Sequence, residues 1–176
     1  QDFPKRDIVF TMNLSPKQLM YEDLVNDFQK LLKKYRMNAE SIVLEIIEYA
    51  VFDKPDVMSR NLSALKKLGF QLAIDGFGLD YQTLSQVDNL EIDIIKLDNE
   101  FLKDQEAYMK SKFANLLIDF AERNKYKVIC EAIENEEMLE AAKQYKIKYM
   151  QGYYYTKPVS AESLKGYIGT ESWKHV

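Results

Sequence analysis

Residues 92–96 read Ile-Asp-Ile-Ile-Lys, a short run rich in β-branched residues that ends in a charged side chain. Such runs favour strands, and a core strand has no use for an unpaired charge, because burying one is costly. The same pattern recurs along the chain. The runs are Ile8–Leu14, Ile42–Ile47, Gln71–Ile74, Ile92–Ile95, Lys127–Cys130 and Ile147–Met150. Their polar residues are, in the same order, Asn13, Glu45, Asp75, Lys96, Glu131 and Gln151.

Helical periodicity alternates with these runs. One helix is predicted to begin at Pro16, with apolar residues repeating at helical spacing as far as Leu32. The other predicted helices are Asp56–Leu68, closed by Gly69, then Asp104–Lys125, Asn135–Tyr145 and Ala161–Ile168. This alternation predicts parallel strands joined by right-handed crossovers. In a parallel β/α barrel the carboxyl ends of the strands carry the active site, so the polar residues predict a functional ring there.

The predicted fold class is therefore α/β, a TIM-type (β/α) barrel. A closed barrel of this type needs eight units, and we count about six, so N-terminal units are expected to be missing. An open arc leaves two unpaired strand edges, which upstream sequence, a partner subunit or a rearranged N-terminal segment is expected to cover. The chain opens at Gln1 and shows no linker-like segment. We therefore expect a piece of a longer polypeptide, with residues 1–176 forming one partial domain without an internal boundary.

Composition excludes several classes of function. The formal net charge of -4 argues against a DNA- or RNA-binding surface, which would need a basic stripe. Cys130 is the only cysteine and His175 the only histidine, which excludes a disulfide framework, a thiolate zinc cluster and histidine-rich catalysis. No apolar stretch approaches the roughly 20 residues of a membrane span, and no signal-peptide pattern is present. These features fit a cytoplasmic location.

The polar residues at the run ends suggest a chemistry. Asn13, Glu45 and Asp75 offer hard oxygen donors, the ligands that Mg²⁺ and Mn²⁺ prefer. Lys96 could hold a phosphate oxygen or an activated water, and Glu131 is a candidate general base. Together they favour metal-assisted hydrolysis of a phosphate ester. A Schiff base on the lysine is the alternative chemistry.

Ordinary structural roles are open for the same residues. Asn13 could cap the helix that follows it. Lys96 could simply pair with Asp75 or Asp98. Glu45 and Glu48 could be solvated strand-end charges. Glu131 could complement the dipole of the next helix.

Six segments of the chain resemble the motifs of the EAL-domain family, in the family's order, from about Ile8 to Pro158. They are Met12-Asn13-Leu14-Ser15-Pro16, Leu44-Glu45-Ile46-Ile47-Glu48, Ala73-Ile74-Asp75-Gly76-Phe77-Gly78, Ile95-Lys96-Leu97-Asp98, Cys130-Glu131-Ala132-Ile133-Glu134 and Gln151-Gly152-Tyr153-Tyr154-Tyr155. The resemblance implies the last three-quarters of a domain that hydrolyses cyclic di-GMP to linear pGpG. It also implies a modified TIM barrel and two metal ions.

The resemblance also implies a role for each matched residue. Asn13, Glu45 and Asp75 correspond to metal ligands, Lys96 and Glu131 to catalytic residues, Glu48 to a loop anchor, and Asp98 and Gln151 to polar support of the substrate site.

Several departures from the family's motifs suggest weakened catalysis. The Glu-Ala-Leu signature itself is absent from the chain. Gly76 stands where the family has a second aspartate, Ala132 where it has glycine, and Ile47 where it has threonine. We therefore expect at most one weakly held Mg²⁺ or Mn²⁺ and a phosphodiesterase that is impaired or inactive. The alternative is a non-catalytic signalling module that binds cyclic di-GMP or a protein partner.

Overall fold

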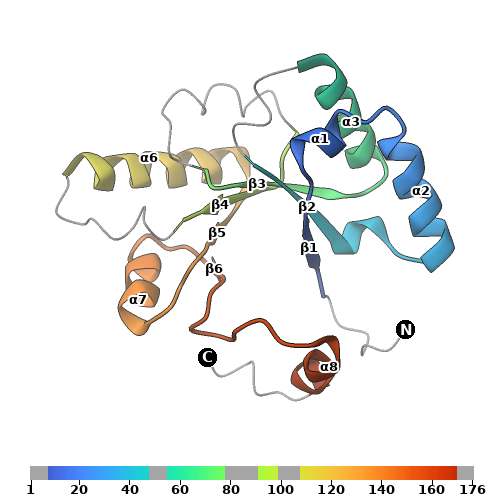
Figure 1. Cartoon of the computed structure of the whole chain (residues 1–176). Coiled ribbons are helices and arrows are strands. Elements are labelled where there is room, and N and C mark those ends of the chain that lie inside the picture. The colour runs from blue at the N-terminus through green and yellow to red at the C-terminus, as the bar shows by residue number, and fades with distance from the viewer. Residues whose placement is uncertain (1–7, 48–54, 78–90, 99–107, 170–176) are drawn as a thin grey trace.

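The structure is a computed structural model that describes residues 8–47, 55–77, 91–98 and 108–169. Among the described residues a helix follows each strand except β3 (Figure 1). The strands are β1 (Phe10–Asn13), β2 (Ile42–Ile47), β3 (Gln71–Asp75), β4 (Ile94–Leu97), β5 (Lys127–Cys130) and β6 (Tyr149–Met150). The helices are α1 (Pro16–Leu19), α2 (Leu24–Tyr35), the 3-10 helix η1 (Ala39–Ser41), α3 (Pro55–Lys67), α6 (Tyr108–Asn124), α7 (Glu136–Gln144) and α8 (Ala161–Gly169).

The strands form one six-stranded sheet in the order β1-β2-β3-β4-β5-β6, and every neighbouring pair is parallel. The helices between the strands, α1 to α3, α6 and α7, lie around the outside of the sheet, as in part of a (β/α) barrel (Figure 1). The prediction of a partial TIM-type barrel is confirmed. In the described part of the chain β1 and β6 are the two edges, and Phe10, Met12 and Tyr149 on them are exposed.

The predicted strand bounds agree with the structure within a few residues. The runs at 42–47 and 127–130 match in full. The fourth strand begins at Ile94 and continues to Leu97, so Lys96 lies within the strand rather than after it. The predicted helix over 56–68 spans Pro55–Lys67 and is followed by Gly69 at φ 100°, where the Phe70 N–H donates to the Leu65 carbonyl at 3.3 Å.

The single helix predicted to begin at Pro16 is wrong, because the structure divides it into α1 and α2. The Asn61 side chain in α3 is buried and donates to the carbonyls of Leu19 (2.7 Å) and Tyr21 (3.1 Å). A continuous helix would use those carbonyls itself. The cap of α1 is Ser15, not Asn13: its hydroxyl accepts from the Gln18 N–H, and the Gln18 side chain accepts from the Ser15 N–H.

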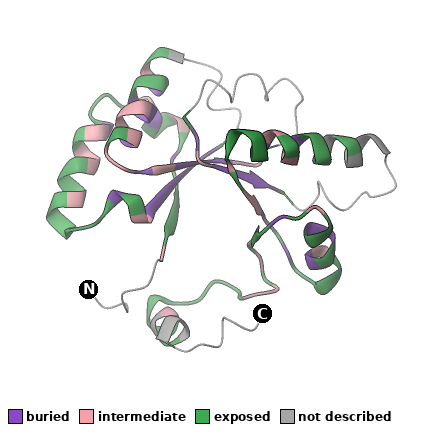
Figure 2. Ribbon diagram, turned by 180° about the vertical axis from the view of Figure 1, so that it is seen from behind, coloured by how far each residue is buried: buried purple, intermediate pink, exposed green. Residues whose placement is uncertain are grey.

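The outward face of the sheet packs against the helices in two apolar clusters. One cluster joins Leu44 and Leu72 to α1, α2 and α3, and includes Leu19 and Leu65. The other joins Ile95 and its neighbours to α6 and α7. Figure 2 shows buried residues along the central strands and exposed residues on the outer sides of the helices. This packing provides the hydrophobic stabilisation of the fold.

The inward face carries a smaller apolar cluster. Val43, Ala73 and Ile94 are buried there, with Ile129 packed against them. Because side chains alternate along a strand, the residue two positions later on each of these strands faces the same way. Those residues are Glu45, Asp75, Lys96 and Glu131. The apolar cluster is therefore the floor below the predicted site.

Candidate functional site

The strand register places the six predicted rim residues on one face of the sheet. Asn13 pairs with Glu45, and Glu45 pairs with Ala73, which is two residues before Asp75. Ala73 pairs with Ile94, two residues before Lys96. Lys96 pairs with Ile129, which is two residues before Glu131. Ile129 pairs with Tyr149, which is two residues before Gln151. Since two residues along a strand restore the same face, all six belong to the inward face near the carboxyl ends of the strands.

Three of these residues, Glu45, Asp75 and Glu131, meet around the ammonium of the fourth, Lys96. Its Nζ lies 2.8 Å from Glu45 Oε1, 2.5 Å from Glu131 Oε1 and 3.7 Å from Asp75 Oδ1. The side chains of Lys96 and Glu45 are only 3% and 7% exposed, whereas those of Glu131 and Asp75 are 18% and 30% exposed. The cluster is therefore closed on the strand side and opens to solvent past Asp75. The hypothesis that Lys96 pairs with Asp75 is correct but incomplete.

Lys96 is held in its charged form. Burial alone would lower the pKa of its amine, but the contacts with Glu131 and Glu45 outweigh burial and raise that pKa above its usual value. A Schiff-base lysine needs an unprotonated amine and hence a lowered pKa. The Schiff-base alternative therefore does not fit this environment, whereas a fixed positive charge near a phosphate does.

Glu131 has the most perturbed carboxyl of the cluster. Burial raises its pKa, the Lys96 ammonium lowers it, and contact with Asp75 raises it again, to about 7 in all. A carboxyl with that pKa can take up and release a proton near neutral pH. Glu131 also points to Lys96, while Glu136 and Glu137 occupy the first turn of α7. The described contact of its carboxylate is therefore with the Lys96 cluster, and its alternative role at the helix dipole stays untested.

The cluster has unused capacity for a cation. Glu45 Oε1 is buried, and its polar contact among the described residues is the Lys96 ammonium at 2.8 Å. Three carboxyl groups also share a single ammonium, which leaves surplus negative charge. Oxygen donors with surplus charge fit a hard divalent ion such as Mg²⁺ or Mn²⁺. Within the described ranges, however, no acidic, cysteine or histidine side chains are grouped as a ready-made metal site.

The remaining predicted residues surround this cluster. Asn13 is exposed on the edge strand β1, beside Glu45 in register. Gln151 follows β6 with an exposed side chain, and its N–H donates to the Cys130 carbonyl at 2.8 Å. Asp98 is exposed just beyond β4. Glu48 lies outside the described residues.

One support of the site was missed in the sequence. Beyond β5 and β6 the backbones interlock: the Ile133 N–H donates to the Gln151 carbonyl at 3.1 Å, and the Tyr154 N–H donates to the Ile133 carbonyl at 2.9 Å. Gly152 permits this contact, and a glycine directly after Gln151 was the available signal. Ala132, next to Glu131, has φ 53°, a left-handed conformation that suits glycine better.

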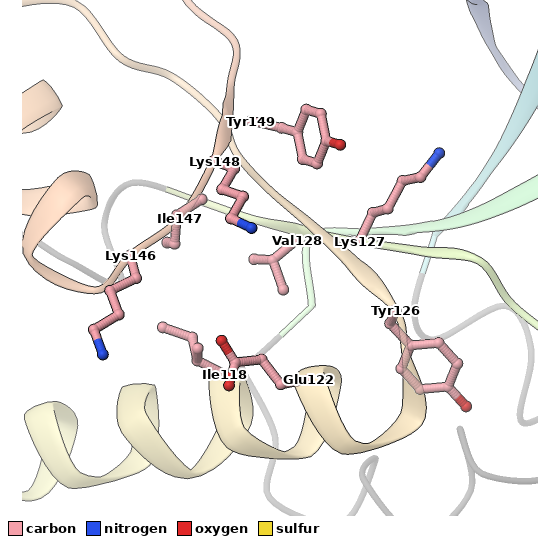
Figure 3. Close-up of a pocket in the computed structure, with 9 residues that line it drawn as sticks. All are labelled: Ile118, Glu122, Tyr126, Lys127, Val128, Lys146, Ile147, Lys148 and Tyr149. Carbon is pink, nitrogen blue, oxygen red and sulfur yellow. The ribbon is translucent and has the colours of Figure 1, made fainter.

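A separate pocket of about 210 Å³ lies at the opposite ends of β5 and β6 (Figure 3). Its floor is apolar, with Ile118, Val128 and Ile147, and its surroundings include Lys127 and Lys148. It contains none of the predicted site residues. This pocket therefore shares no residue with the cluster around Lys96.

Comparison with known proteins shows which family the chain resembles. The family model described as the EAL domain matches residues 1–158. The cyclic di-GMP phosphodiesterase PdeF of Escherichia coli is 31% identical over 150 residues, which are 85% of this chain and 20% of PdeF. The crystal structure of the EAL domain of Mycobacterium smegmatis DcpA superposes with a TM-score of 0.83 at 25% identity, covering 92% of this chain and 73% of that one.

A third relative has a bound ligand. The FimX EAL domain of Pseudomonas aeruginosa, solved bound to c-di-GMP, has a TM-score of 0.78 at 25% identity, with 85% of this chain and 62% of that chain covered. The chain spans about a fifth of the length of the first curated relatives that it matches. Within the described residues, no helix is long and apolar enough to cross a membrane.

Proposed function

The chain belongs to the EAL-domain family, and on that premise we propose that it carries part of a metal-dependent site for cyclic di-GMP. The observation that carries the proposal is the meeting of Glu45, Asp75 and Glu131 around Lys96 at the carboxyl ends of parallel strands. A phosphodiester is anionic. It would be repelled by a cluster in which three carboxyl groups share a single ammonium. A divalent ion at the cluster would remove that repulsion.

The proposed roles follow from the environment of each residue. Asn13, Glu45 and Asp75 would hold one Mg²⁺ or Mn²⁺, which when bound supplies an activated water and offsets charge on the phosphate. Glu131, with a pKa of about 7, would accept the proton of the attacking water. Lys96 stays protonated and would stabilise negative charge on the phosphate oxygens.

Polar residues around the cluster would support the substrate. We assign this role to Asp98 and Gln151, and the anchoring of the adjoining loop to Glu48. The reaction would open one phosphodiester bond of cyclic di-GMP to give linear pGpG. PdeF is named for such an activity, and the FimX EAL domain binds the same dinucleotide.

Hydrolysis by this chain is proposed to be impaired or absent. Gly76 follows Asp75 at φ 70°, with no side chain where the family's motif has a second carboxylate. This observation favours a second candidate function, a non-catalytic signalling module that binds cyclic di-GMP or a protein partner. In either case we propose that residues 1–176 form a single partial EAL domain in the cytoplasm. Upstream domains or a second copy would complete it.

Two measurements on the protein that carries this chain test these functions. Release of pGpG is measured in Mn²⁺, and binding of cyclic di-GMP is measured by calorimetry in Mn²⁺ and in chelator. Hydrolysis lost in Glu131→Gln but retained in Glu140→Gln, a surface variant on α7, supports the enzyme. Binding without hydrolysis favours the signalling module. Absence of both binding and hydrolysis excludes a cyclic di-GMP function.

A further inference from the structure

The ammonium of Lys96 occupies the position where the candidate metal ligands come closest together. Its Nζ lies within 4 Å of carboxylate oxygens from the three elements that carry Glu45, Asp75 and Glu131. The lysine side chain is 3% exposed and reaches this point from within β4, above the buried Ile94. No other described lysine is as deeply buried.

A buried ammonium and a divalent cation cannot both use the same oxygens. They repel each other strongly where the dielectric is low, and both need the oxygens of Glu45 and Asp75. With Lys96 in place, each carboxylate near it is already partly neutralised. A metal ion that enters must therefore either displace the lysine or bind weakly beside it.

We propose that Lys96 is a built-in counter-ion, which holds Glu45 and Glu131 together in the metal-free protein and must leave Glu45 when a divalent ion binds. The inference rests on one part of the proposed function, which is that the chain has a site for a divalent ion. It does not depend on hydrolysis. It gives the lysine a role that is separate from any contact with substrate, and it makes Lys96 a determinant of metal affinity.

The same geometry explains how the metal-free site can persist. Three carboxyl groups brought together without a cation would repel one another, and breaking a buried ion pair is strongly destabilising. The Lys96 ammonium removes that repulsion from within the fold. We expect this arrangement to lower the affinity for a divalent ion, because an ion that binds must replace contacts that the carboxylates already make with Lys96.

The test compares Lys96→Met with Lys66→Met. Lys66 is half-buried and pairs with Asp93 near the beginning of β4, away from the cluster, so it controls for loss of a lysine ion pair. Mn²⁺ affinity is measured by calorimetry, and melting temperature is measured in chelator and in Mn²⁺. We expect Lys96→Met to bind Mn²⁺ at least tenfold more tightly than the unaltered protein. It should also melt lower in chelator and regain most of that loss in Mn²⁺, whereas Lys66→Met should lose equally in both.

Equal or weaker Mn²⁺ binding by Lys96→Met would overturn the inference, even if the unaltered protein hydrolyses cyclic di-GMP. Absence of Mn²⁺ binding in both proteins would also overturn it. Mn²⁺ binding by the variant alone would support the counter-ion role while removing the metal-dependent function from the unaltered protein. If Lys96→Met does not fold in chelator, Lys96→Gln retains one donor for a carboxylate and is expected to change Mn²⁺ affinity in the same direction.

Discussion

The backbone of Gly152 lies against that of Ile133 so closely that a Cβ on Gly152 would be 2.0 Å from the Ile133 carbonyl oxygen. Gly152→Ala should therefore force the segments after β5 and β6 apart, at a cost of about 3 kcal/mol in the free energy of unfolding. Denaturant titration measures this. Gly166→Ala is the matched control, because Gly166 lies in α8 with open space around it, and it should gain about 0.5–1 kcal/mol. Equal effects of the two substitutions would contradict the interlock.

Glu131 should make stability depend on pH. Its pKa of about 7 in the folded chain lies above its ordinary value of 4.5, so the folded state holds this proton more tightly than the unfolded state. The resulting stabilisation is fully present below about pH 4.5 and is lost as the pH rises to about 7. The loss should be on the order of 1–3 kcal/mol. Urea titrations in chelator across this window should show a flatter profile for Glu131→Gln, and an unchanged slope would disprove the assignment.

Gly76→Asp should strengthen metal binding. Among the described residues no atom lies within 4 Å of a Cβ built at Gly76, so a carboxylate beside Asp75 meets no described neighbour. Aspartate tolerates the left-handed φ of 70° better than most residues, at a cost of roughly 1 kcal/mol. Calorimetry with Mn²⁺ should show affinity raised several-fold. Gly76→Asn has the same shape without the charge, and a similar gain in that variant would show that charge is not the cause.

Ala132→Gly should stabilise the chain. Ala132 has φ 53°, where an alanine is strained by roughly 1 kcal/mol and glycine is not. Part of that gain is lost because glycine is freer in the unfolded chain, which leaves about 0.5 kcal/mol. The measurement is the melting temperature. In α7, Ala142→Gly should do the opposite, because that alanine is buried in a helix. A drop in melting temperature for Ala132→Gly would mean that the methyl group packs usefully.

The sequence was sufficient for the sheet and for the face on which the site lies. Short β-branched runs predicted the six strands of the described sheet, since a nearly continuous apolar run is a strong local signal for a buried parallel strand. The polar residues at the ends of the runs could be assigned to one edge of the sheet, because parallel strands have their carboxyl ends on the same side. Glu45 was recognisable because it interrupts an otherwise apolar run.

Contacts between segments that are far apart in the sequence could not be predicted in the same way. The division between α1 and α2 depends on Asn61, which is 40 or more residues away along the chain. The fit of Gly152 against Ile133 also depends on how two segments meet in space. The convergence of Glu45 and Glu131 on Lys96 requires the curvature of the sheet, which no local pattern specifies.

The alternation along β2 has an evolutionary consequence. Leu44 and Ile46 pack outward against helices, whereas Glu45 between them faces the inner cluster. Selection for a folded module therefore acts mainly on one set of positions, and selection for hydrolysis acts on the other. A lineage could lose its enzymatic output through one inner substitution and still retain a folded receptor. A mutational scan of β2 should accordingly show loss of folding at Leu44 and Ile46, whereas substitutions of Glu45 should act first on the inner cluster.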